Sequence, residues 1–155
     1  MLSTTAEYAL RIMVALAHSS HSPTTSERIA QTASLPTDYS VKVLQMLARA
    51  GLVRAQRGRG GGFQLSCDPA KTTLLDVVNA IDPIERITSC PVGSTGEQRS
   101  LCSLHRRLDE VIGGLRDDLA ATTLAAILAM KPGPALCQPA KSATVIATAG
   151  VAHSG

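Results

Sequence analysis

The 155-residue chain has few aromatic side chains: two tyrosines, one phenylalanine and no tryptophan, or 2% of its residues. Apolar residues make up 45% of the chain and are mainly Leu, Ile, Val and Ala, which favours a mostly helical protein with an aliphatic core. No run of about 18 apolar residues is present to cross a bilayer, and the first residues lack the charged start and apolar stretch of a secretion signal. We therefore expect a cytoplasmic protein with no membrane partner.

Acidic residues are missing from one long window, between Asp38 and Asp68, although the net charge of the whole chain is only +3. That window holds a third of the 15 Lys and Arg residues: Lys42, Arg49, Arg54, Arg57 and Arg59. A local excess of cations is typical of a surface that binds an anion such as a phosphate backbone.

Three helices are predicted in the first 50 residues. Apolar residues at three- and four-residue steps predict the first over 4–19. The S/T-x-x-E spacing from Thr24 to Glu27 predicts a capping box and a short second helix over 25–32. The third runs over 37–50 and stops at Gly51, placed as a C-terminal cap residue would be. The last two, joined by a tight turn, form a predicted helix-turn-helix.

The third helix has two unlike faces at 100° per residue. The packing face is predicted to hold Ser40, Val41, Leu44, Leu47 and Ala48. The opposite face carries side chains of hydrogen-bonding length and is free to contact bases: Asp38, Tyr39, Lys42, Gln45, Met46 and Arg49. The alternative is an ordinary solvated helix face.

Two short extended segments, 52–55 and 62–65, follow this helix and flank an arginine-glycine tip. The glycines permit the backbone angles of a hairpin turn, and the tip could enter a minor groove. A nucleotide-binding glycine loop is disfavoured, because the third glycine is misplaced and no helix follows. We predict phosphate contacts from Arg49, Arg54 and Arg59, and sequence selectivity from Tyr39, Lys42, Gln45 and Arg57.

The C-terminal half is predicted to contain a short helix beneath the hairpin, begun by a Thr73–Asp76 capping pair and ended by Asp82-Pro83. A longer helix over 103–122 follows an irregular loop. Its near-heptad apolar seam predicts a dimerisation helix, with packing onto its own head as the alternative. The Gly113-Gly114 pair indicates either close approach of two backbones or a weak point. A last short helix is predicted over 124–130, and residues 131–155 are predicted to be a disordered tail.

These elements, in this order, resemble the IscR/NsrR superfamily of winged helix-turn-helix transcription regulators over residues 1–130. The resemblance rests on the Glu-Tyr-Ala-Leu-Arg of 7–11, the Gly-Leu-Val of 51–53, the hairpin tip 57–63 and the late cysteine loop. It implies a homodimer that binds a palindromic operator in double-stranded DNA. The residues implied to lie at base edges or, for the arginine, in the minor groove are Asp38, Tyr39, Val41, Lys42 and Arg57.

The cysteine loop departs from the pattern of the cluster-binding members, which carry three cysteines at six-residue steps and, in some, a histidine three residues later. Cys90, Cys102 and His105 match, whereas Gly96 occupies the middle place. The resemblance therefore implies three of the four ligands of a [2Fe-2S] cluster. The fourth could be Glu7, whose place resembles that of an acidic ligand borrowed from the partner subunit.

Other interpretations of these residues stay open. The loop could instead sense oxidation through its thiols alone, hold zinc or have no sensing role, because lone Cys and His residues are more often structural. Glu7 could simply pair with Arg11, one turn away. Cys67 is predicted to be a packing residue, and Cys137 an exposed one in the tail.

Two functions remain at this point. The first is a dimeric, sequence-specific DNA-binding repressor that senses iron-sulfur or redox status, with a DNA-binding domain over 1–83, a sensor loop over 84–102 and a dimerisation region over 103–130. The second is a small redox or metal-handling protein whose winged head mediates protein contacts. An enzyme is not expected, because no catalytic motif surrounds a pocket.

Overall fold

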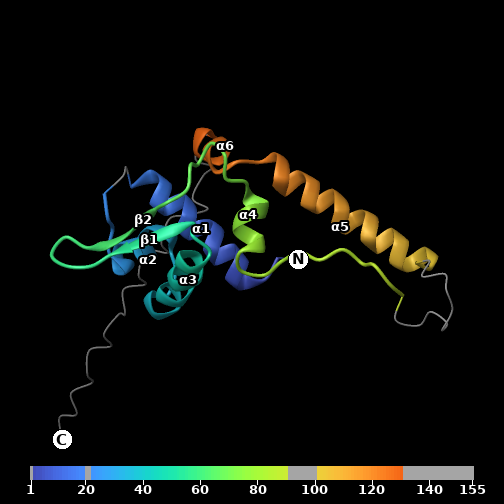
Figure 1. Ribbon diagram of the computed structural model, residues 1–155, viewed down its shortest axis with the longest axis horizontal. Coiled ribbons are helices and arrows are strands. Elements are labelled where there is room, and N and C mark those ends of the chain that lie inside the picture. The colour runs from blue at the N-terminus through green and yellow to red at the C-terminus, as the bar shows by residue number, and fades with distance from the viewer. Residues whose placement is uncertain (1, 20–21, 91–100, 131–155) are drawn as a thin grey trace, which may run out of the picture.

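The computed structural model describes residues 2–19, 22–90 and 101–130 (Figure 1). These residues form helices and one antiparallel two-stranded hairpin, which confirms the predicted fold class. The elements are α1 (Thr4–His18), α2 (Ser26–Ala33), α3 (Thr37–Arg49), β1 (Val53–Gln56), β2 (Gly62–Leu65), α4 (Leu74–Asn79), α5 (Ser103–Ala121) and α6 (Leu124–Ala129).

Helix α1 lies at the centre of the head and contacts α2, α3, α4, α6 and β2. Because neighbours cover several of its sides, α1 buries more of its circumference than the single predicted stripe. Leu10 and Val14 of that stripe are only partly buried, whereas Ala9, Ile12 and Leu16 belong to the core. The core is aliphatic, as the composition indicates.

The second helix begins one residue later than its predicted capping box. The Thr25 hydroxyl, not that of Thr24, accepts from the amide of Arg28. Thr24 instead exchanges two backbone hydrogen bonds with Phe63, at 2.9 and 2.8 Å. The prediction was wrong because this long-range pairing, which local spacing does not reveal, occupies Thr24.

Helix α3 ends as predicted. Gly51 has φ +76°, and the amides of Gly51 and Leu52 bond to the carbonyls of Ala48 and Leu47, the pattern of a Schellman motif. The packing face differs in one position from the projection: Val43 is fully buried, whereas Val41 is only half-buried. Asp38, Lys42, Gln45 and Arg49 are exposed.

The hairpin pairs Val53 with Leu65 and Gln56 with Gly62 at its two ends. The Thr24 backbone adds a bridge beside β2 and so fixes the hairpin to the loop before α2. Gly62 makes this possible, because a Cβ there would lie 2.5 Å from the Thr24 carbonyl oxygen. The hairpin extends away from the helices (Figure 1).

Helix α4 starts with the predicted Thr73–Asp76 capping box, in which each side chain bonds the other residue's amide. It packs chiefly against α1 and α5, and not beneath the hairpin as predicted. The reason is non-local: backbone bonds from Leu74 to Thr122 and from Leu124 to Thr72 fix the start of α4 to the α5–α6 junction.

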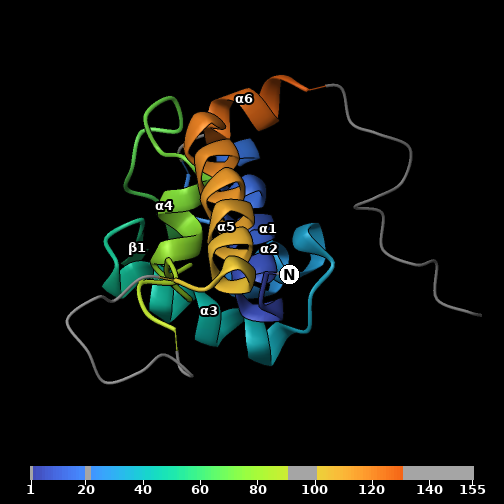
Figure 2. The ribbon, with the colours of Figure 1, turned by 90° about the vertical axis from the view of Figure 1, so that its right-hand side faces the viewer.

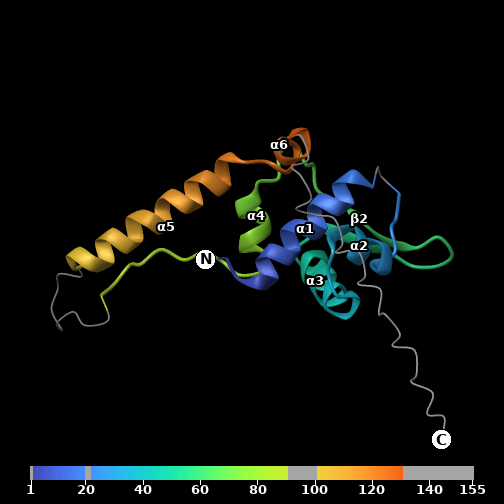
Figure 3. The same ribbon diagram turned by 180° about the vertical axis from the view of Figure 1, so that it is seen from behind.

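Helix α5 projects from the head, with its first turn at the far end (Figures 1 and 3). Residues 84–90 run back along it, on the side away from the hairpin (Figure 2). No helix in the part of the chain described here is long and apolar enough to cross a membrane. The predicted middle loop position, Gly96, and the tail with Cys137 lie outside the described residues.

Candidate nucleic-acid interface and cysteine-histidine site

The five cations of the acid-free window all have exposed side chains, on α3, β1 and the hairpin tip. Across residues 2–19, 22–90 and 101–130, the ion pairs are Glu7 with Arg11, Arg86 with Asp109, and Arg107 with Glu110. None of them involves the five cations, so the positive charge of this surface is not neutralised by carboxylates of the described chain. We call Lys42, Arg49, Arg54, Arg57 and Arg59 the cationic surface.

Tyr39 at the start of α3 is tied to α1. Its hydroxyl lies 2.7 Å from the hydroxyl of Thr5, and its ring meets that of Tyr8 edge to face, with centroids 5.5 Å apart. The Tyr39 side chain remains 36% exposed. It therefore helps to fix the angle between α3 and α1 while one side stays open to a ligand.

Arg54 faces Gln64 across the hairpin, where the two residues are register partners. In the orientation that satisfies both groups, the Gln64 amide oxygen accepts hydrogen bonds from the Arg54 guanidinium, including one from Nε at 2.8 Å. This neutral partner orients Arg54 without cancelling its charge.

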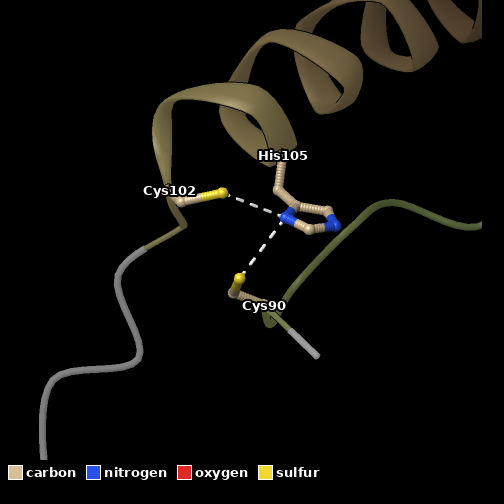
Figure 4. Close-up of side chains that lie close together, drawn as sticks. All are labelled: Cys90, Cys102 and His105. Atoms are coloured by element: carbon tan, nitrogen blue, oxygen red, sulfur yellow. Dashed lines mark hydrogen bonds between the residues drawn. The ribbon is translucent and has the colours of Figure 1, made fainter. Parts of the chain in front are cut away.

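The structure brings Cys90, Cys102 and His105 together at the free end of α5 (Figure 4). Nδ1 of His105 lies 3.3 Å from Sγ of Cys90 and 3.1 Å from Sγ of Cys102. All three potential ligand atoms lie within 4.8 Å of one another. Two thiols and an imidazole at this separation can bind a soft metal centre, and the two thiols can also join in a disulfide after a small movement.

Cys102 is the N-cap residue of α5. The backbone amide and the imidazole of His105 stabilise its thiolate, which lowers the pKa of Cys102 to about 7. About half of the Cys102 side chains would then be thiolate at neutral pH, and the thiolate is the form that binds metals and reacts with oxidants.

Two other predicted residues lie apart from this site. Glu7 bonds Arg11 at 2.6 Å within α1, and its carboxylate does not join the Cys90–Cys102–His105 group of its own chain. Cys67 is half-buried against the core, and none of the three cysteines in the described residues forms a disulfide.

The sequence interpretation missed the residues that hold Cys90 in place. Arg86 and Asp109, 23 positions apart, form a short ion pair that fixes residues 84–87 to α5. No local spacing predicts a contact of this range.

The comparisons with known proteins agree with the fold and the exposed cationic surface. A model of the Rrf2 family, described as an iron-dependent transcriptional regulator, matches residues 2–130. The chain belongs to the Rrf2 family. It is thus a DNA-binding transcriptional regulator, not an enzyme, and the resemblance seen in the sequence is confirmed.

Several Rrf2 relatives are similar along most of the matched region. IscR of Vibrio vulnificus is 27% identical over 128 residues, which are 82% of this chain and 76% of that protein. NsrR of Bacillus subtilis is 32% identical over 85 residues, 54% of this chain and 58% of that protein. The solved structure of CymR, the global cysteine regulator of B. subtilis, has a TM-score of 0.67 and 28% identity, covering 83% of this chain and 95% of that one.

Proposed function

We propose that this Rrf2 protein is a cytoplasmic, homodimeric repressor that binds a palindromic operator and senses iron-sulfur or redox status through Cys90, Cys102 and His105. The observation that carries the DNA-binding half is the cationic surface, which is exposed and unpaired in the described chain. A surface of this kind gains affinity by releasing counterions from DNA phosphates.

Each part of the surface has a role in this proposal. Exposed α3 side chains of Asp38, Tyr39, Lys42 and Gln45 would lie against base edges in the major groove. Arg57 at the hairpin tip would enter the neighbouring minor groove, where an arginine gains from the negative potential. Arg49, Arg54 and Arg59 would contact phosphates and set the register.

Dimerisation through α5 is supported by a row of exposed apolar side chains at four-, three- and four-residue steps. Their exposed fractions are high for residues of this type: Leu104 64%, Leu108 45%, Val111 57% and Leu115 38%. A helix with such a face buries it against a partner, and a second copy of α5 supplies a matching row. Two heads related by a twofold axis would then contact a palindromic site.

The sensor half is tested by the donor set. Two thiols and one imidazole, with donor atoms within 4.8 Å, are of the types that hold iron-sulfur clusters. In the proposal Cys90, Cys102 and His105 hold a [2Fe-2S] cluster, with Glu7 of the partner subunit as the fourth ligand. Such a cluster, when bound, supplies a one-electron redox centre. Oxidation of the two thiols is the alternative signal at the same place.

The DNA-binding half is tested by fluorescence anisotropy with duplex from the protein's own promoter and with a random duplex of equal length, at moderate salt. We expect clear preference for the promoter. Equal affinity for both duplexes would favour the alternative, in which the winged head contacts a protein.

The sensor half is tested by anaerobic purification, an absorption spectrum and an iron count, with Cys102→Ala as the control. We expect visible charge-transfer bands and about two iron atoms per chain, as a [2Fe-2S] cluster contains. A colourless, iron-free protein that still binds DNA would remove the cluster and leave thiol oxidation as the signal.

A further inference from the structure

The inference concerns what brings Cys90 to Cys102 and His105, and it rests on the proposed sensor function. Cys90 comes from the segment after α4, whereas Cys102 and His105 lie at the start of α5. Residues 84–90 form no helix or strand of their own, so side-chain contacts must determine where Cys90 lies.

Asp109 provides the main contact. Its Oδ1 accepts from Nε of Arg86 at 2.6 Å and from the amide of Ile87 at 2.9 Å, and its Oδ2 accepts from Nη2 of Arg86 at 2.5 Å. The Asp109 side chain is only 16% exposed. This bidentate pair with an added backbone bond is the strong, directional form of ion pair.

Gly113 and Arg116 extend the contact along the same helix. Gly113 is buried, and a Cβ there would lie 3.1 Å from Nη1 and 3.2 Å from Cζ of Arg86, so the absence of a side chain makes room for the guanidinium. Arg116 donates to the carbonyl oxygen of Ile84. This replaces both predicted roles of Gly113: what approaches closely is a guanidinium.

These residues share one face of α5 with the histidine. His105, Asp109, Gly113 and Arg116 follow one another at steps of four, four and three residues, the spacing of a single helix face. The exposed apolar row from Leu104 to Leu115 lies on another. One face of α5 therefore carries the proposed dimer contact, and a second carries both the sensor histidine and the contacts to residues 84–87.

We propose that Arg86, Asp109, Gly113 and Arg116 are positioning residues of the sensor: they form a clasp that holds residues 84–87 on α5 and thereby places Cys90 beside Cys102 and His105. The clasp touches no ligand atom itself. Its function is to raise the effective concentration of the Cys90 thiol at the other two donors, as residues behind metal ligands commonly do.

The test measures that effective concentration without iron. In the full-length chain with Cys67→Ala and Cys137→Ala, oxidised glutathione takes two electrons from Cys90 and Cys102, forming one disulfide and two reduced glutathione molecules that carry the two protons. Mass spectrometry after acid quenching gives the equilibrium constant. We expect Asp109→Asn and Gly113→Leu to lower it by about tenfold or more.

Matched controls are present on the same helix. Glu110→Gln makes the same chemical change at an exposed position that pairs only with Arg107, and Gly114→Leu adds the same side chain where a Cβ meets nothing within 4 Å. Both should leave the constant unchanged. Leucine favours helix more than glycine, so Gly113→Leu keeps α5 folded even if Asp109→Asn does not, and circular dichroism checks this.

A second readout, Co²⁺ binding followed by its thiolate charge-transfer band, separates this inference from the proposed function. We expect the clasp variants to lose about 10- to 100-fold in Co²⁺ affinity. If all variants match the wild type in both assays, or if the wild type forms no disulfide, the clasp is wrong. If the clasp variants lower the disulfide constant while the wild type binds neither Co²⁺ nor iron, the clasp stands and the metal-sensing function fails.

Discussion

The hydroxyl of Tyr39, in the helix proposed to enter the major groove, lies 2.7 Å from the hydroxyl of Thr5 in α1. Glu7, the proposed trans ligand, lies two residues further along α1. The contact therefore joins the helix that would face DNA to the helix that would reach the partner's sensor. This gives a short physical connection between the two sites.

Replacing Tyr39 by phenylalanine tests this contact. The ring still meets Tyr8, so the change removes only the hydrogen bond, and the free energy of unfolding should fall by about 1 kcal/mol or less. Urea denaturation measures it. Thr5→Val removes the same bond, so the double variant should be no less stable than either single variant; additive losses would show that the two hydroxyls act independently.

Replacing Arg59 by alanine tests its assignment as a phosphate contact. Affinity should fall about equally on promoter and random duplexes, and the salt slope should flatten by about one unit. Arg107→Ala, which removes an arginine from α5, should change neither quantity. A shift in sequence preference on losing Arg59 would assign that residue to base contacts instead.

Replacing Leu108 by glutamate tests the dimer. A carboxylate within the exposed apolar row would be buried without a partner, so the dimer should dissociate to monomer in sedimentation velocity, and operator affinity should fall with it. Glu110→Lys on a neighbouring face of α5 is the control for a changed charge. A Leu108→Glu protein that sediments as a dimer would mean that another surface joins the subunits.

The pKa of Cys102 predicts a pH dependence of thiol reactivity. Because His105 stabilises the thiolate and lowers this pKa to about 7, iodoacetamide should modify Cys102 of the reduced, metal-free protein with a midpoint near pH 7. His105→Ala should move the midpoint upward, towards the ordinary range of about 8.5. Peptide mass spectrometry across pH 5.5–9.5 measures both rates; an identical midpoint in the two proteins would contradict the assignment.

Patterns within one element predicted much of this fold. The Thr73–Asp76 capping box and the Gly51 stop hold because their hydrogen-bonding partners lie within a few residues. The three-residue spacing from Cys102 to His105 likewise predicted that these two side chains converge. Each depends on local geometry alone.

Contacts between distant parts of the chain account for the rest. Thr24 could not be excluded as a cap without its pairing to Phe63, 39 positions away in the sequence. The role of Gly113 was hidden because its neighbour, Arg86, arrives from a separate segment. The approach of Cys90 to His105 depends on that same contact, so the sequence supplied the candidate ligands but not the means that assembles them.

Amide hydrogen exchange with and without promoter duplex tests the central claim, that the α3 and hairpin surface binds DNA, most directly. We predict that DNA slows exchange in peptides covering residues 37–49 and 53–65, and that peptides from α4, distant from the hairpin, change little. Slowed exchange confined to other segments, with both of these peptides unchanged at saturating DNA, would contradict it.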